Sequence, residues 1–172
     1  KGKTLGVIGF GRIGQATAKI GIGAGMKVIA FDPFIDSADL ALDFFDGQQV
    51  NFTINTVSKE TVLEQADFLT LDVPAQKEYV IDEAEFNSMK DGIFIANAAR
   101  GGVINEVALV KAIESGKVAR AALDVFEKEP EPEVQLLMNP SLSLTPHTGA
   151  ATNEAQDRIG VELASQIISL LS

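Results

Sequence analysis

Three charged side chains in the C-terminal half of the chain, Arg100, Glu129 and His147, each follow a short apolar run. A guanidinium group can bind a carboxylate through two parallel hydrogen bonds. His147 is the only histidine, and an imidazole oriented by a carboxylate can exchange a proton near neutral pH. Each residue also has an ordinary interpretation: Arg100 could bind loop carbonyls, His147 could be structural or exposed, and Glu129 could lie in a solvated acidic loop.

A glycine motif near the N-terminus suggests a second kind of chemistry. Gly9, Gly11 and Gly14 follow an apolar run and open a helical pattern, and Asp32 ends a second apolar run 18 residues after Gly14. This context predicts a dinucleotide-binding βαβ unit. In it the first glycine makes the turn, the second admits a pyrophosphate, the third allows close helix packing, and the acid binds the adenosine ribose. The alternative, a plain glycine turn, leaves Asp32 unexplained.

Asp32 also discriminates between dinucleotides. The 2′-phosphate of NADP beside this carboxylate would meet a like charge. The next residues, Pro33, Phe34 and Ile35, offer no Arg or Lys to relieve that repulsion. The sequence therefore favours NAD as the cofactor.

The composition excludes several classes of protein. A length of 172 residues suits one domain with a sizeable core. The net charge of −10 argues against nucleic acid as a partner. Zinc sites are commonly built from several Cys and His ligands, and this chain has one histidine and no cysteine, so no metal is expected. No apolar run reaches the ~18 residues of a membrane span, so we expect no membrane partner.

Apolar runs alternate between strand-like and helix-like patterns, which predicts an α/β fold: a doubly wound parallel sheet with helices on both faces. The expected strands are Thr4–Ile8, Val28–Phe31, Asp67–Val73, Ile93–Asn97, Arg120–Phe126 and Leu142–Thr145, with a further short strand at Val50–Ile54. The expected helices are Gln15–Gly25, one capped by Ser58, one capped by Asp82 and Glu85, Glu106–Ser115, and a long amphipathic helix from Thr152. Residues 33–49 read as irregular, with a short helix near Ser37–Leu42.

Ligands of such sheets bind at the carboxyl ends of the strands. The segments that follow the strands are 9–14, 32–34, 72–76, 97–102, 124–129 and 146–150. They contain all of the residues singled out above. We therefore expect Glu129 and His147 to lie within hydrogen-bond distance, with the Arg100 side chain across the space left for a substrate.

Four motifs in this order resemble one family. They are Gly-Phe-Gly-Arg-Ile-Gly from Gly9, Asn-Ala-Ala-Arg-Gly-Gly from Asn97, Leu-Asp-Val-Phe-Glu-Lys-Glu-Pro from Leu123, and Thr-Pro-His-Thr-Gly from Thr145. Over essentially its whole length the chain resembles the NAD-binding domain of the D-isomer-specific 2-hydroxyacid dehydrogenases. The resemblance implies a Rossmann fold. It also implies that residues 1–172 are the cofactor domain of a longer two-domain protein whose substrate domain lies outside this chain.

The resemblance also implies roles for single residues. His147 would be the general acid/base, Glu129 would orient it, and Arg100 would hold the substrate carboxylate, while Asp124 would contact the nicotinamide carboxamide. The residues implied to bind the cofactor are Gly9, Gly11, Arg12, Ile13, Gly14, Asp32, Pro33, Val73, Pro74, Ala98, Ala99, Arg100, Asp124, His147 and Gly149. One departure is Asp72, which stands where the family usually has histidine.

The implied activity is hydride transfer between NAD and C2 of a small D-2-hydroxy acid or its 2-oxo product, in a cytoplasmic homodimer built through this domain. The resemblance favours 3-phosphoglycerate, the substrate of the first step of serine biosynthesis. Glyoxylate or hydroxypyruvate reduction stays open, as does a non-enzymatic, NAD-sensing co-repressor. The isolated domain is expected to have little or no turnover.

Overall fold

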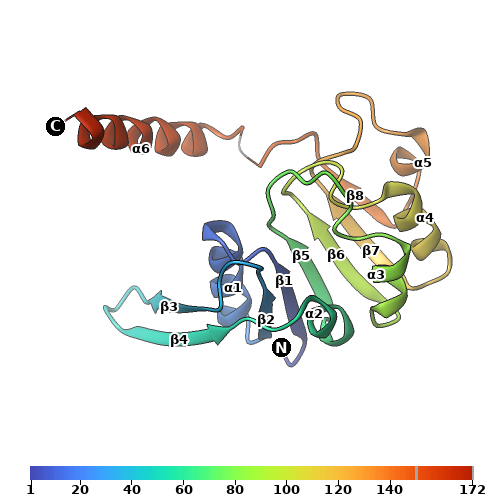
Figure 1. The fold of residues 1–172 in the computed structure, drawn as a ribbon, viewed down its shortest axis with the longest axis horizontal. Coiled ribbons are helices and arrows are strands. Elements are labelled where there is room, and N and C mark those ends of the chain that lie inside the picture. The colour runs from blue at the N-terminus through green and yellow to red at the C-terminus, as the bar shows by residue number, and fades with distance from the viewer. Residues whose placement is uncertain (150, 172) are drawn as a thin grey trace.

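The computed structural model describes residues 1–149 and 151–171, which form a parallel six-stranded sheet in the order β2-β1-β5-β6-β7-β8 (Figure 1). The strands of this sheet are β1 (Thr4–Ile8), β2 (Lys27–Phe31), β5 (Phe68–Leu71), β6 (Ile93–Asn97), β7 (Val118–Leu123) and β8 (Leu142–Leu144). The strand order reverses between β1 and β5, because β2 lies on one side of β1 and every later strand on the other. This reversal is where a doubly wound sheet opens a crevice for a ligand.

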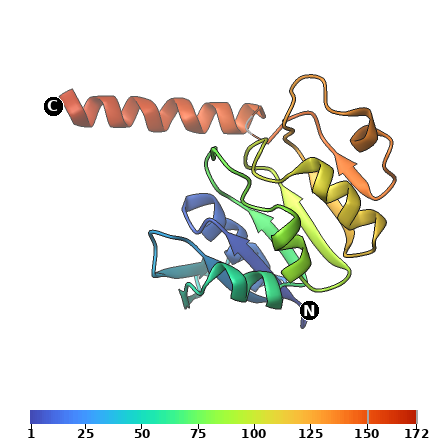
Figure 2. The same ribbon diagram turned by 45° about the vertical axis from the view of Figure 1, so that its right-hand side comes forward.

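Helices lie on both faces of the sheet, as predicted. The helices are α1 (Arg12–Gly23), α2 (Lys59–Gln65), α3 (Glu83–Ser88), α4 (Glu106–Glu114), α5 (Val134–Leu137) and α6 (Asn153–Leu171), although α6 covers neither face (Figures 1 and 2). The face that carries α2, α3 and α4 holds the larger core, in which Leu69, Ile95 and Leu109 are buried. The face under α1 holds a smaller core with Val7 and Phe10.

The turn from β1 into α1 needs glycine at two positions. Gly9 has a φ of 93°, in the left-handed region that side chains other than glycine rarely adopt. At Gly14 a Cβ would lie 2.0 Å from the Gly9 carbonyl oxygen. The close approach of helix and strand that the motif predicted is therefore present.

The segment after β2 differs from the prediction. Instead of irregular chain with a short helix near Ser37–Leu42, two strands, β3 (Ser37–Asp43) and β4 (Gln49–Asn55), pair antiparallel as a separate hairpin. Its inward-facing Leu40 is buried against the α1 core. The expected strand at Val50–Ile54 exists, but it belongs to this hairpin and not to the main sheet.

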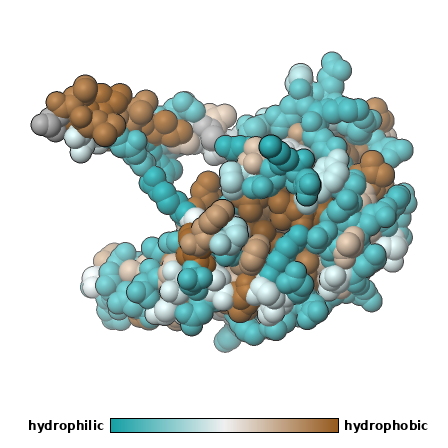
Figure 3. Space-filling model, viewed as in Figure 1, coloured by the Kyte–Doolittle hydropathy of each residue, from teal (hydrophilic) through white to brown (hydrophobic). Residues whose placement is uncertain are grey.

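The long C-terminal helix is present and projects away from the sheet (Figure 1). Thr152 caps it by accepting a hydrogen bond from the Ala155 N–H at 3.2 Å. None of the described α6 residues is buried, and the helix extends away from the body of the domain in both ribbon views (Figures 1 and 2). Figure 3 shows apolar surface along it. Packing of α6 on the sheet of its own chain is therefore not observed.

Candidate active site

The N-terminus of α1 is shaped to receive an anion. Gly11 is its N-cap and supplies no side-chain hydrogen bond, so the first N–H groups of the helix lack the partner that a capping side chain would give. A Cβ at Gly11 would meet nothing within 4 Å. Uncapped N–H groups beside open space, at the positive end of a helix dipole, suit a pyrophosphate.

Asp32 lies at the end of β2 beside this turn. Its carboxylate accepts a hydrogen bond from the Phe10 N–H at 2.7 Å and another from the Phe34 N–H at 2.9 Å. The carboxylate is therefore fixed at the edge of the glycine turn, where the sequence places the ribose. Pro33 follows it and is exposed.

The segment after β5 closes the other side of the turn. A Cβ at Gly9 would lie 2.6 Å from the Asp72 carbonyl oxygen and 2.9 Å from the Val73 side chain. The Asp72 N–H donates to the Ile8 carbonyl at 2.8 Å. Val73 thus lies against the glycine turn, and Pro74 follows it in the chain; cofactor contacts of both residues stay a prediction.

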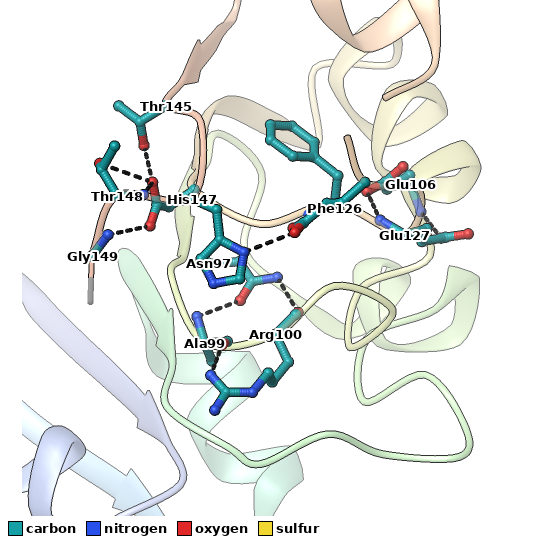
Figure 4. A network of polar contacts seen from close by, with 12 residues as sticks. Asn97, Ala99, Arg100, Glu106, Phe126, Glu127, Thr145, His147, Thr148 and Gly149 are labelled. Atoms are coloured by element: carbon teal, nitrogen blue, oxygen red, sulfur yellow. Dashed lines mark hydrogen bonds and ion pairs between the residues drawn. The ribbon is translucent and has the colours of Figure 1, made fainter. Parts of the chain in front are cut away.

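Asn97, the last residue of β6, holds the loop that carries Arg100. Its buried side chain accepts a hydrogen bond from the Ala99 N–H and donates one to the Arg100 carbonyl, both at 3.1 Å. The exposed Arg100 guanidinium donates to the Ala99 carbonyl at 2.6 Å (Figure 4). Ala98, which is exposed, lies in the same loop.

His147 and Glu129 form the contact that the topology predicted. The His147 Nδ1 atom lies 2.8 Å from Glu129 Oε2, and Glu129 Oε1 accepts the Phe126 N–H at 3.0 Å. Two hydrogen bonds lower the pKa of Glu129 below its usual range: the larger effect comes from His147 and the smaller from the Phe126 N–H. His147 has a φ of 54° and is the one residue other than glycine with positive φ in the described chain. Such strain is typical of functional positions.

Asp124 holds the His147 loop from below. This buried carboxylate accepts hydrogen bonds from the Thr148 N–H at 2.8 Å, the Gly149 N–H at 2.9 Å and the Thr145 hydroxyl. Burial alone would raise the pKa of Asp124, but these hydrogen bonds outweigh it and the pKa lies below its usual range. These contacts are all internal, so in this structure Asp124 positions the loop; the contact with a nicotinamide stays a prediction.

The structure brings some predicted residues together and leaves others apart. Among the described residues no hydrogen bond joins Arg100 to Glu129 or His147. Arg12, predicted to face the cofactor, instead makes a two-pronged ion pair with Glu162 of α6 at 2.6 and 3.1 Å. Ile13 beside it is 70% exposed.

Sequence reasoning assigned no role to Asn97, Thr145 or Thr148, which fix the two loops. A usable signal existed only for Asn97, a polar residue at the end of an apolar strand.

A cavity of about 440 Å³ adjoins His147 and Glu129. Its walls also include Phe126, Pro130, Pro132, Leu137, Leu144, Thr145 and Pro146.

Comparison with known proteins decides the family. The model of the D-isomer specific 2-hydroxyacid dehydrogenase NAD-binding domain matches residues 1–149. The chain belongs to this family. NAD is therefore the cofactor of this domain. The glycine turn, the uncapped N-terminus of α1 and Asp32 are the features that fit it.

Several curated dehydrogenases of the family are similar in sequence. Hydroxypyruvate reductase of Thermotoga maritima is 43% identical over 99% of this chain and 53% of its own length. D-3-phosphoglycerate dehydrogenase of Archaeoglobus fulgidus is 42% identical over 99% of this chain and 31% of its own. The chain therefore spans about half or less of the length of these relatives.

Solved dehydrogenase structures share the fold. A D-2-hydroxyisocaproate dehydrogenase matches with a TM-score of 0.81 and 31% identity, over 99% of this chain and 53% of its own. A glyoxylate reductase from Paecilomyes thermophila matches with a TM-score of 0.77 and 38% identity, over 94% of this chain and 47% of its own. Both support the Rossmann assignment.

Residues 1–149 and 151–171 contain neither a cluster of metal-ligating side chains nor a membrane-spanning helix. Within these ranges no group of three or more His, Cys, Asp or Glu residues is arranged to hold a metal ion. No helix in the described part of this dehydrogenase domain is both long and apolar enough to cross a bilayer.

Proposed function

We propose that this chain is the cofactor domain of a longer enzyme that oxidises D-2-hydroxy acids, or reduces the corresponding 2-oxo acids. The observation that carries the proposal is the His147–Glu129 contact at 2.8 Å, on the same sheet edge as the glycine turn. Family membership supports the oxidoreductase class. The Arg100–Glu129–His147 assignment rests on the geometry and on the motifs.

The geometry indicates how the proton would move. Glu129 engages Nδ1 of His147, so Nε2 is the ring nitrogen left to face a substrate. In the oxidation, Nε2 takes the proton of the C2 hydroxyl while the C2–H bond breaks and the C2–O bond becomes a carbonyl. NAD, when bound, takes up the hydride that leaves C2. The Glu129 carboxylate accepts a hydrogen bond from the imidazolium that results, and in reduction the same imidazolium returns the proton.

Arg100 would bind the substrate. Its guanidinium is exposed and holds only the neighbouring Ala99 carbonyl among the described residues. A carboxylate is a stronger partner for this group because the hydrogen bonds are then charge-assisted and paired. Substrate binding would therefore turn the side chain from its own loop toward C1 of the acid.

We propose 3-phosphoglycerate as the substrate, with hydroxypyruvate and glyoxylate as alternatives. Similar relatives carry the names D-3-phosphoglycerate dehydrogenase, hydroxypyruvate reductase and glyoxylate reductase. A panel of these acids, assayed by NADH absorbance with the longer enzyme, ranks them by kcat/KM. A highest value for glyoxylate or hydroxypyruvate would overturn the choice of 3-phosphoglycerate.

His147→Gln in the longer enzyme tests the catalytic assignment. Removal of the proton carrier should lower kcat by about 10²-fold or more. NAD affinity should stay within about threefold, because the imidazole acts on the substrate and not on the dinucleotide. Near-normal turnover by this variant would show that another group carries the proton, and no turnover by the unmodified enzyme with any 2-hydroxy acid would favour a non-enzymatic role.

A further inference from the structure

The backbone of Phe126, through the peptide units on either side of it, connects to all of the proposed catalytic residues. The Phe126 N–H donates to Glu129, which in turn binds His147. On the Arg100 side, a Cβ at Gly101 would lie 1.9 Å from the Phe126 carbonyl oxygen. A shift of Phe126 would therefore move both loops, because the Val125–Phe126 peptide holds Glu129 and the loop that carries Arg100 rests directly on the Phe126–Glu127 peptide.

Glu106, at the start of α4, holds that peptide in place. Its carboxylate accepts the Glu127 N–H at 2.7 Å, and the Glu127 carboxylate accepts the Glu106 N–H at 2.9 Å (Figure 4). The two residues thus exchange side-chain-to-backbone hydrogen bonds between a helix start and the catalytic loop. Each bond satisfies a backbone N–H group that otherwise has no such partner.

The same pair reaches the segment that follows β5. The Tyr79 hydroxyl donates to the second oxygen of the Glu127 carboxylate at 3.2 Å. Tyr79 lies at the end of the segment that begins with the predicted cofactor-contacting residues Val73 and Pro74. The Glu106–Glu127 pair therefore connects three loops of the site.

We propose that Glu106 is a positioning residue for the dehydrogenase reaction, acting through the backbone of Glu127 and Phe126 on Glu129 and Arg100. The proposal rests on the proposed function for the roles of Glu129 and Arg100, and on the hydrogen bonds given above for the way in which Glu106 reaches them. Glu106 is only 8% exposed, so it is not itself a substrate-binding group.

The role needs an acceptor atom and not a charge. Burial raises the pKa of Glu106, its hydrogen bond from the Glu127 N–H lowers it, and the charges of Glu127, Glu133 and Glu129 raise it further. A neutral side chain with a carbonyl oxygen at the same place would make the same hydrogen bond without this repulsion. Glutamine should thus replace Glu106, and a side chain of similar length with no acceptor should not.

The matched variants Glu106→Gln and Glu106→Met of this chain separate positioning from bulk. The readout is the pH titration of the Glu129 carboxyl carbon by NMR, assigned from the signal lost in Glu129→Gln. In Glu106→Gln the titration should stay at the unmodified midpoint. In Glu106→Met it should move up by about half a pKa unit or more, because the loop no longer presents Glu129 to His147 and to the Phe126 N–H.

Glu127→Ala provides a second route, because Glu127 is exposed and its loss does not open the core. It removes the acceptor for the Glu106 N–H and the Tyr79 hydroxyl and should move the Glu129 titration in the same direction. An unchanged Glu129 titration in both Glu106→Met and Glu127→Ala overturns the proposal. An equal shift in Glu106→Gln and Glu106→Met overturns it as well, because a charge effect would then explain the result.

Kinetics of the longer enzyme complete the test. Glu106→Met should lower kcat by about tenfold or more with NAD affinity changed less than about threefold, while Glu106→Gln keeps turnover near normal. If the unmodified enzyme turns over no 2-hydroxy acid, the proposed function fails, but the titration still tests the positioning of Glu129. If the enzyme is active and Glu106→Met keeps its full kcat, the positioning role is wrong.

Discussion

Asp72 has a protonation equilibrium far from that of an aspartate in water. Its burial raises the pKa to about 6, against the smaller effect of a hydrogen bond from Thr70. It lies beside the glycine turn at the end of β5, where the family usually has histidine. The folded state therefore favours the neutral acid, and ionisation at higher pH costs stability.

Asp72→Asn tests this environment. Between about pH 4 and pH 6 the folded chain holds a proton that the unfolded chain releases, so Asp72 makes the unfolding free energy fall as pH rises through this window. At pH 7 the variant should be more stable by about 1 kcal/mol, allowing for solvent screening of the partly exposed carboxyl. The gain should vanish near pH 4. Urea unfolding of both proteins across this range measures the difference.

Asp67→Asn is the matched control. The Thr4 N–H lowers the pKa of Asp67, burial opposes this, and Lys90 and Lys3 add to the lowering. Its stabilising effect is present at neutral pH and lost as pH falls through the folded pKa, so this variant should be less stable at pH 7. If Asp72→Asn is also destabilised at pH 7, the assigned environment of Asp72 is wrong.

At the scale of residues, the sequence was sufficient to predict contacts made at strand ends. Glu129 and His147 follow neighbouring parallel strands, so topology alone places them together. The Glu106–Glu127 exchange escaped prediction because each carboxylate binds a backbone N–H, which leaves no mark on residue type or spacing. The Arg12–Glu162 pair escaped prediction because the two residues lie 150 positions apart and α6 extends away from the body of the domain.

At the scale of elements, most of the parallel sheet was predictable and the β3–β4 hairpin was not. The segment Ser37–Leu42 is rich in Ala and Leu, which favour helices. Its alternation of apolar and polar residues, and the Asp46-Gly47 turn that follows, are hairpin signals. The segment forms a strand because the apolar side of this alternation packs on α1. That contact is made only in the folded chain and could not be predicted from the sequence.

The glycine turn allows a prediction with an internal control. Gly14→Ala should destabilise the domain by about 1–3 kcal/mol, because its Cβ would clash with the Gly9 carbonyl. Gly11→Ala should change stability by less than about 1 kcal/mol, since nothing lies near its Cβ, yet weaken NAD binding about tenfold or more by occupying the pyrophosphate space. Thermal unfolding and calorimetry measure both. Normal NAD affinity in Gly11→Ala would contradict the placement of the pyrophosphate.

At the scale of the whole molecule, two apolar surfaces lack a partner within the described chain. One is the stripe of Ile159, Leu163, Ile167 and Leu170 on α6, whose members are 47–84% exposed. The other is the sheet face over β5–β8, where Phe94 is 40% exposed although its ring stacks on that of Phe68 with ring centroids 4.9 Å apart. Surfaces of this kind mark sites of association.

We predict a homodimer formed through this domain, with the α6 stripe in the contact. Sedimentation of the chain should show a dimer at high micromolar concentration. Leu163→Glu should shift it to monomer, whereas Ser165→Glu on the opposite side of the helix should not. Monomer alone at that concentration would reject dimerisation by this domain.

The most direct test of the account is the cofactor preference of the chain itself. Calorimetric titration with NAD and with NADP should show the tighter affinity for NAD, because Asp32 repels a 2′-phosphate and binds the ribose hydroxyls. Asp32→Ala should weaken NAD binding and narrow the gap between the two. Equal affinity of the unmodified chain for NAD and NADP would contradict the role of Asp32 and, with it, the reading of residues 9–32 as an NAD site.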